Sequence, residues 1–323
     1  MPIIVKGEGT DKSNSRAILR RAKSKVITQK VILSLIEVAK ERNELNRVKA
    51  YWNTYHCQNR IFEADDKLFG NYCKNRFCTI CAGIRKAEII NKYWPIISEW
   101  KEPYFLTLTA KSVPANKLKS RMQRMLLSLK KILNRNKKRY MRGKGIKFEG
   151  IRSLECNFNP VQRWYNPHFH IIVSTKEAAE LILKEWLIQC TPKFALIDGQ
   201  KIRKVEDKVH DLIEVVKYGS KIFTDPTMKK RAKRTVAPYI YVSAFHNIIW
   251  AMSGHRIFER FGFNLPPRTK ETKMTLAIEY EQLKFAPELF DWVNEETAEL
   301  LSGYQPTGEL LSILRDNINF DLQ

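Results

Sequence analysis

The stretch NPHFHIIV, residues 166–173, carries two histidines one residue apart at the head of an apolar run. Its β-branched and aromatic content predicts a strand, and successive side chains of a strand point to opposite faces. His168 and His170 therefore share one face, while Phe169 and Ile171 point into the opposite layer. Two imidazoles about 6 to 7 Å apart along one face can chelate one divalent cation. An H-x-H pair alone is more often structural than catalytic, so its interpretation depends on the surrounding sequence.

The elements predicted around this strand place it in a mainly antiparallel sheet. FEGIRSLECNF (148–158) is predicted to be its hairpin partner, and YFLTLTA (104–110) is predicted to be a further strand. A basic amphipathic helix is predicted within 118–145, and a capped helix at about 175–190. This order of strand, helix, paired strands, helix, strand and helix predicts an α+β fold, with a ferredoxin-like or RRM-like sheet flanked by helices.

The charge of the chain indicates a polyanionic partner. There are 57 Lys plus Arg against 34 Asp plus Glu, a net charge of +23, whereas residues 271–323 are acidic. Such a basic field attracts nucleic acid through counterion release, although a ribosome-associated or membrane-surface protein has similar charge. No apolar run reaches membrane-spanning length and the N-terminus lacks the order of a secretory signal, so we expect a cytoplasmic protein without a membrane partner.

Four cysteines lie within 25 residues of each other and predict a structural zinc site. Cys73, Cys78 and Cys81 follow a C-x4-C-x2-C pattern, and Cys57 lies sixteen residues upstream. Four thiolates satisfy tetrahedral Zn²⁺ and leave no open position for water. His56 is an alternative to one of these ligands, and inert buried thiols are the alternative to a metal site.

A helix predicted over Asp207–Phe223 supplies a candidate nucleophile. Tyr218 lies on its polar stripe between Lys217 and Lys221, one turn after Glu214. A phenol with a reference pKa of about 10 is a poor nucleophile at neutral pH, and neighbouring cations favour the phenolate. The alternative is an ordinary surface tyrosine.

Three motifs occur in the order found in the HUH endonucleases: FLTLTAKSV (105–113), PHFHIIV (167–173) and EVVKYGSK (214–221). The chain resembles the rolling-circle replication initiators, or Rep proteins, of small bacterial plasmids within that superfamily. FCTICAGIRK (77–86) and SGHRIFERFGF (253–263) resemble further blocks of one plasmid Rep family. The resemblance covers most of the chain.

The resemblance implies a metal-dependent single-strand DNA endonuclease that nicks and rejoins an origin. His168 and His170 are then expected to hold catalytic Mg²⁺ or Mn²⁺. Tyr218 is expected to attack the scissile phosphate, leaving a 5′-phosphotyrosine and a free 3′-hydroxyl that primes a polymerase. Glu214 occupies the place of the acidic residue that activates water for termination in single-tyrosine relatives.

Glu155 is the candidate third ligand of the catalytic metal. It lies on the strand that precedes the histidine pair, and a hairpin brings it beside His168 or His170; a cross-strand salt bridge is the alternative. Thr107 and Thr109 share one strand face and are candidates for lining the same site.

The DNA is expected to enter as a melted or extruded strand, single-stranded or hairpin, at a plasmid origin. Aromatic residues in the loop before the histidine pair offer stacking surfaces, and basic residues offer phosphate contacts. The candidate DNA contacts are Arg85, Arg121, Arg124, Lys130, Lys131 and Trp164. A host helicase, a polymerase and a second copy of the chain are further candidate partners.

The predicted organisation has five segments. They are a basic helical arm (1–50), a cysteine-rich zinc-binding segment (51–100), the HUH catalytic core (101–225), a basic helical extension (226–268) and an acidic helical tail (269–323). The tail is either an end cap or a segment that binds the basic face of the protein or a host helicase and so limits reinitiation. The acidic residues of that hypothesis are Glu288, Asp291, Glu295, Glu296 and Glu299.

Two other functions remain open from the sequence. HUH-type transposases and relaxases use the same metal pair and tyrosine, although relaxases usually place the tyrosine near the N-terminus and use a third histidine. A zinc-containing nucleic-acid-binding protein without catalysis accounts for the charge and the cysteines, with residues 168–173 as an ordinary core strand.

Overall fold

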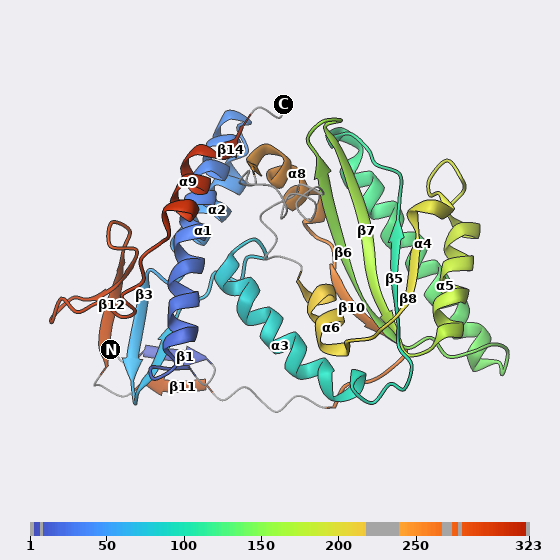
Figure 1. Cartoon of the computed structure of the whole chain (residues 1–323), viewed down its shortest axis with the longest axis horizontal. Coiled ribbons are helices and arrows are strands. Elements are labelled where there is room, and N and C mark those ends of the chain that lie inside the picture. Colours follow the sequence, from blue (N-terminus) through green and yellow to red (C-terminus); the bar gives the residue numbers. More distant parts are fainter. Residues whose placement is uncertain (1–2, 7–8, 218–238, 267–272, 277–279, 321–323) are drawn as a thin grey trace. The chain divides into compact units, whose positions relative to one another are not determined.

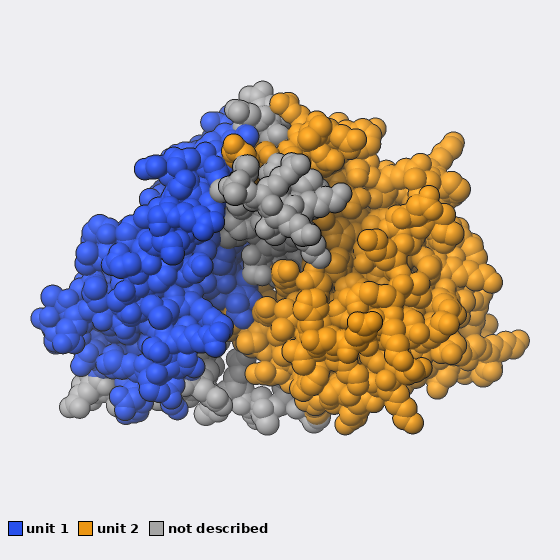
Figure 2. All heavy atoms as spheres, viewed as in Figure 1, with its two compact units in different colours: residues 1–83, 267–320 blue, residues 84–266, 321–323 orange. Residues whose placement is uncertain are grey.

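The computed structural model describes residues 3–6, 9–217, 239–266, 273–276 and 280–320. The chain divides into two compact units, which Figure 2 colours separately: Met1–Gly83 with Pro267–Phe320, and Ile84–Pro266 with Asp321–Gln323. The first contains the four clustered cysteines and the second contains the histidine pair. Each unit has its own antiparallel five-stranded sheet.

The sheet of the second unit confirms the predicted α+β class with antiparallel pairing. Its strand order is β10-β6-β7-β5-β8, and every neighbouring pair is antiparallel. The predicted hairpin is the β6–β7 pair, in which all ten residues of each strand are in register. The strands are β5 (Tyr104–Thr109), β6 (Gly150–Asn159), β7 (Trp164–Val173), β8 (Lys201–Lys204) and β10 (Phe258–Phe261).

Helices cover both faces of this sheet (Figure 1). On one face, Phe169 and Ile171 pack in a core with α4 (Ala115–Met141), α5 (Lys176–Gln189) and α8 (Val242–Met252). On the other face, Ile172 packs with α6 (Lys208–Val216) and with the C-terminal part of α3 (Thr79–Ile97). A short helix (Ile197–Gly199) precedes β8, and β9 (Ile240–Tyr241) precedes α8. Because strand side chains alternate, each residue of β7 faces one of these two cores.

The extension predicted as helical at 226–268 is only partly helical where the structure describes it. Helix α8 ends at Met252, and Gly254 follows with a φ of 79°, a left-handed conformation that favours glycine. The chain then forms β10, which pairs with the outer edge of β6. The helical prediction is therefore wrong for the residues after α8. An unpaired sheet edge offers backbone hydrogen bonds that no local pattern reveals.

The first unit combines two long helices with the second sheet. The helical arm predicted over 1–50 is observed as the helices α1 (Ser15–Glu41) and α2 (Leu45–Tyr55), and the described residues before α1 include two short strands. None of the described helices combines the length and apolar character needed to cross a bilayer. The sheet order is β13-β12-β3-β4-β2, formed by β2 (Thr10–Asp11), β3 (Arg60–Ala64), β4 (Lys67–Gly70), β12 (Glu281–Ala286) and β13 (Asp291–Asn294). A separate pair joins β1 (Ile3–Lys6) to β11 (Lys273–Leu276).

The acidic tail is not the helical segment that the sequence predicts. It contributes β11, β12 and β13, and its described helix is α9 (Gly308–Asp316), followed by β14 (Ile318–Asn319). Leu283 and Phe285 are buried while Lys284 between them is exposed, a period-two pattern typical of a strand. Strand β12 pairs with β3, more than two hundred residues earlier, so the decisive contact is long-range.

Two buried tail residues hold this arrangement. The indole of Trp292 is fully buried and packs edge-on against Phe285, with 5.0 Å between the ring centres. It donates a hydrogen bond of 2.7 Å to the carbonyl oxygen of Gln58. The carboxylate of Asp291, also fully buried, accepts hydrogen bonds from the backbone N–H groups of Trp292, Ser302 and Gly303. Asp291 therefore stabilises the tail itself, and its buried carboxylate does not belong to an acidic surface for a partner.

We expect Trp292→Ala to destabilise the protein strongly. Removing a fully buried indole leaves a cavity and an unpaired Gln58 carbonyl, which costs about 3 to 5 kcal/mol. Urea unfolding followed by circular dichroism measures this loss. Leu289→Ala, at a half-exposed position of the β12–β13 turn, is the matched control and should change stability by less than about 0.5 kcal/mol. Equal midpoints for the two variants would contradict the structural role of the tail.

Candidate active site

The histidine pair and Glu155 form one group of ligands on the sheet face that α6 covers. In the β6–β7 register, Glu155 lies opposite His168 and Ser153 lies opposite His170. One ligand atom from each of Glu155, His168 and His170 lies within 4.8 Å of the other two. The structure therefore brings the predicted third ligand to the predicted pair.

Hydrogen bonding orients His168 toward the carboxylate. Its Nδ1 donates to the carbonyl oxygen of Asn166 at 3.0 Å, which leaves Nε2 as the nitrogen that can accept a metal. This Nε2 lies 3.8 Å from the Glu155 Oε2, and the two imidazole rings are 4.9 Å apart. Glu155 and His168 are buried, and His170 is half-buried.

This donor set fits a divalent cation. Two imidazole nitrogens and one carboxylate oxygen converge from adjacent strands, and neither backbone has to move for them to meet. Mixed nitrogen and oxygen sites of this kind suit first-row divalent ions, and the carboxylate also suits Mg²⁺.

The two threonines predicted to line the site belong to the same sheet face. Thr107 pairs with His170 and Thr109 pairs with His168 in the β5–β7 register. The hydroxyl of Thr109 donates to the carbonyl oxygen of Gly199 at 2.9 Å, and its backbone N–H donates to Gln200 at 2.8 Å. Thr109 therefore ties the segment before β8 to the sheet beside the histidines.

Helix α6 is held against this face by its own apolar stripe and by one ion pair. Leu212, Val215 and Val216 are buried in the core that contains Ile172. Asp211, also buried, accepts two hydrogen bonds from the guanidinium of Arg203 on β8. The hydrogen bonds to Asp211 raise the pKa of Arg203.

Glu214 and Lys217 follow at the end of α6. The ammonium of Lys217 lies 3.2 Å from the Glu214 Oε2, and the Glu214 side chain is the less exposed of the two. Tyr218 and Lys221 lie outside the described residues, so the predicted helix 207–223 is observed only as Lys208–Val216. Residue 218 is thus separated from the last helical residue of α6 by Lys217 alone.

The four clustered cysteines form the second group of ligands. Their sulfur atoms all lie within 4.8 Å of one another, and both Cys57 and Cys73 lie 3.6 Å from Cys81. Cys57, Cys78 and Cys81 are buried, and Cys73 is half-buried. A hydrogen bond from the Cys57 thiol lowers the pKa of Cys73. His56 is exposed, accepts a hydrogen bond from Asn59 at its Nδ1, and is not part of the group.

Lys25 is a residue of this region that the sequence interpretation missed. Its fully buried ammonium donates hydrogen bonds to the carbonyl oxygens of Tyr55 and Cys57 and to the side chain of Asn59. Burial lowers the pKa of Lys25 to about 8. The available signal was its position three residues after Ala22 and one before Val26, on the apolar stripe of α1.

The structure does not gather the candidate DNA contacts into one place. The guanidinium groups of Arg121 and Arg124 each stack on Phe194, 4.4 Å from its ring centre. Lys130 and Lys131 are exposed on α4, which covers the sheet face opposite to the histidine pair. The two remaining contacts lie elsewhere, at a half-buried position of α3 and at the exposed start of β7: Arg85 and Trp164.

Comparison with known proteins identifies the family. A family model described as a replication protein matches residues 67–187. A "Protein rep" of Staphylococcus aureus is 32% identical over 175 residues, which cover 48% of this chain and 72% of that relative. The chain belongs to the Rep family of plasmid rolling-circle replication initiators. The part that matches the family model contains the histidine pair, Glu155 and three of the clustered cysteines, and it ends before α6.

Other Rep proteins match over shorter regions. Those of Bacillus amyloliquefaciens and Streptococcus pneumoniae are 31% and 28% identical, and the matches span 33% and 34% of their own lengths. No solved structure matches the chain at comparable significance.

We expect Asp211→Ala to loosen α6. The substitution leaves Arg203 without its carboxylate and should cost about 1 to 3 kcal/mol in urea unfolding, because Asp211 is buried and hydrogen-bonded. The control is Lys204→Ala, whose ion pair with Glu102 joins two exposed side chains and is worth at most about 1 kcal/mol. An Asp211→Ala protein as stable as the control would contradict the anchoring of α6 through this pair.

Proposed function

We propose that this protein initiates rolling-circle replication of a plasmid by nicking one strand of its origin with Tyr218. The observation that carries the proposal is the Glu155, His168 and His170 group on the sheet face covered by α6, with residue 218 two positions beyond that helix. A cation site and a phenol on adjoining elements are what strand transfer to tyrosine requires. The membership of the Rep family supports the same reaction.

The topology also supports an HUH-type core. The elements β5, α4, β6, β7, α5 and β8 follow the βαββαβ order, and their strands lie in the order β6-β7-β5-β8. This is the arrangement of ferredoxin-like folds. The histidines lie on a central strand of this sheet, on the face opposite to α4 and α5.

The metal proposed here is Mg²⁺ or Mn²⁺, held by His168, His170 and Glu155. When bound, such a cation polarises the scissile phosphate and neutralises developing charge. The phenolic oxygen of Tyr218 forms the new bond to phosphorus, and the bond from phosphorus to the 3′-oxygen breaks. The phenolic proton is lost and the departing 3′-oxygen gains a proton, which gives a 5′-phosphotyrosine and a 3′-hydroxyl.

Three residues near Tyr218 in sequence are proposed to assist. Positive charge at Lys217 and Lys221 favours the phenolate. The carboxylate of Glu214 would activate water for the terminating cleavage. Glu214 and Lys217 lie together at the end of α6, with the Lys217 ammonium 3.2 Å from the Glu214 carboxylate.

The Cys57, Cys73, Cys78 and Cys81 group is proposed to hold structural Zn²⁺. Four sulfur ligands match a closed tetrahedral site. The hydrogen bond from Lys25 to the carbonyl oxygen of Cys57 fixes one of the ligand-bearing segments in place. We place the protein in the bacterial cytoplasm, acting on origin DNA with a host helicase and polymerase and as a homodimer.

A transposase or relaxase activity is the second candidate. The described metal group contains two histidines and a glutamate in place of the three histidines usual in relaxases, which favours the initiator. The nicking experiment distinguishes these enzymes from a binding protein without catalysis.

We expect Tyr218→Phe to abolish nicking. Wild-type protein with Mn²⁺ should convert a supercoiled plasmid bearing its origin to open circles and leave a covalent protein–DNA adduct on denaturing gels, whereas the variant lacks the attacking oxygen. Loss of a residue that only hydrogen-bonds to a metal ligand lowers activity about 10- to 100-fold. His170→Ala removes a proposed ligand itself and should lower the nicking rate by more than this. Tyr304→Phe, in the first unit, is the control that should nick normally. Nicking by Tyr218→Phe, or uncut plasmid in every reaction, would refute the proposal.

We expect Cys78→Ser to weaken zinc binding and lower the melting temperature. The purified chain should release about one equivalent of Zn²⁺ to a colorimetric chelator after thiol modification, and the variant should release less because one of four ligands is lost. Cys190→Ala removes a buried thiol outside the cluster and should retain the metal. Equal zinc content in the two variants would argue against the four-thiol site.

A further inference from the structure

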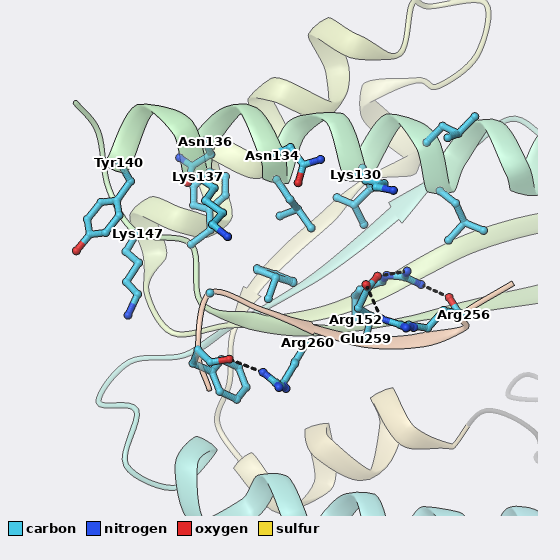
Figure 3. Close-up of a pocket in the computed structure, with 18 of the residues that line it drawn as sticks. Lys130, Asn134, Asn136, Lys137, Tyr140, Lys147, Arg152, Arg256, Glu259 and Arg260 are labelled. Carbon is cyan, nitrogen blue, oxygen red and sulfur yellow. Dashed lines mark hydrogen bonds and ion pairs between the residues drawn. The ribbon is translucent and has the colours of Figure 1, made fainter. Parts of the chain in front are cut away.

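A groove of about 970 Å³ lies on the α4 side of the second unit's sheet, apart from the candidate active site (Figure 3). One wall is a stripe of α4 at helical spacing, and the other is β10 with the residues on either side of it. The stripe includes Leu127, Lys130, Lys137, Tyr140 and Met141. No motif assigned to nicking contributes this surface.

The groove and the histidine pair use opposite faces of the same sheet. Arg152 lines the groove, and the side chain of Leu154 on the same strand packs in the core with α4. Glu155 points to the other face, with His168 and His170. A strand of DNA in the groove would therefore pass around the β10 edge to reach the metal group.

The groove is strongly basic. Its lining contains the cations Lys130, Lys137, Lys147, Arg152, Arg256 and Arg260 against a single carboxylate, that of Glu259. Glu259 pairs with Arg152 at 2.5 Å and with Arg256 at 3.4 Å. Within the described part of the chain, neither Lys130 nor Lys137 forms an ion pair, and both are exposed. These two ammonium groups are therefore available to phosphates.

The wall opposite α4 is closely packed. Arg152 is buried and donates hydrogen bonds to the carbonyl oxygens of Arg256 and Ile257. Gly262 has a φ of 81°, and a Cβ there would lie 1.7 Å from the carbonyl oxygen of Phe148. The segment after β10 thus packs directly on the backbone before β6, so this wall is formed before any ligand arrives.

The exposed rim of the groove carries apolar as well as charged groups. Leu127, Tyr140 and Met141 are 51%, 45% and 76% exposed. A duplex presents mainly phosphates to a groove of this kind, whereas a single strand also presents the faces of its bases, which stack on aromatic side chains. The combination of unpaired lysines and an exposed phenol favours single-stranded DNA over duplex.

We propose that this groove binds a segment of single-stranded DNA, with phosphates on Lys130 and Lys137 and a base on Tyr140. The inference deepens the proposed function and rests on it for the choice of DNA as the polyanion. It also divides the candidate contacts on α4, because Lys130 lines the groove and Lys131 does not.

The test compares two double variants of α4 in their affinity for fluorescein-labelled (dT)20, measured by fluorescence anisotropy over a range of salt. Lys130→Ala with Lys137→Ala removes the two exposed groove lysines, which form no ion pair within the described residues. Lys117→Ala with Lys138→Ala removes two exposed cations of the same helix outside the groove and is the matched control. We expect the groove variant to bind about tenfold more weakly, with a salt slope smaller by about 1.4, the value for two lost phosphate contacts on a single strand. We expect the control to stay within about threefold of wild type.

The aromatic contact is tested in the same assay. Tyr140→Ala should weaken binding by about fivefold or more, and Tyr140→Phe should bind like wild type because the stacking ring is kept. Thermal melts of all variants verify that they are folded. Equal affinities for the two double variants, or no wild-type binding to (dT)20, would overturn the inference. If the groove variant lost affinity only for a duplex probe of the same length, the assignment of the groove to single-stranded DNA would be overturned.

These measurements are independent of nicking. Tyr218→Phe should lose nicking and keep its affinity for (dT)20. The affinity measurement therefore tests the groove even if Tyr218 is not the nucleophile. Conversely, unchanged affinity in the groove variant, together with normal nicking, refutes the groove alone.

Discussion

The register of the β6–β7 pair is the constraint on which the candidate active site depends. Placing Glu155 opposite His168 sets both residues on the same face, and the alternation along β7 brings His170 to that face as well. A slip of β7 by one residue would turn both histidines into the core formed with α4 and α5, away from Glu155. The buried Phe169 and Ile171 oppose such a slip, because it would turn them out of that core. Packing on one face therefore fixes the positions of the candidate ligands on the other.

The elements around the sheet extend this constraint in two directions. On the metal side, the Arg203–Asp211 pair and the apolar stripe of α6 hold the helix that leads to Tyr218. On the α4 side, β10 adds a strand to the edge of β6 and makes one wall of a basic groove. In the first unit, the tail strand β12 pairs with β3. The indole of Trp292 donates a hydrogen bond to the carbonyl oxygen of Gln58, the residue that follows Cys57. A segment classified by its charge thus proves to be part of the fold around the four thiols.

The parts predicted well depend on short-range patterns. The hairpin 148–173, the helices at 118–145 and 175–190 and the clustering of the four cysteines each follow from residues close together in sequence. Glu155 was found because a hairpin pairs neighbouring strands. The errors concern segments whose partners are distant. The tail and the residues after α8 form strands against edges that no local signal reveals. Lys25 appeared to be one more charge in a basic helix, although its ammonium is buried against three backbone and side-chain oxygens.

The sequence alone determined that His168 and His170 point the same way, that four thiols lie close enough along the chain to share an ion, and that the charge favours nucleic acid. These properties arise from the geometry of an extended chain, from short spacings and from composition, none of which requires a fold. Only the tertiary structure decided which helices cover the histidine face, where the tail strands pair, and which cations of α4 face a groove. Those outcomes depend on contacts between segments that are far apart in the sequence. Such segments satisfy one another's backbone hydrogen bonds and bury one another's apolar faces, and short-range sequence patterns do not reveal which segments pair.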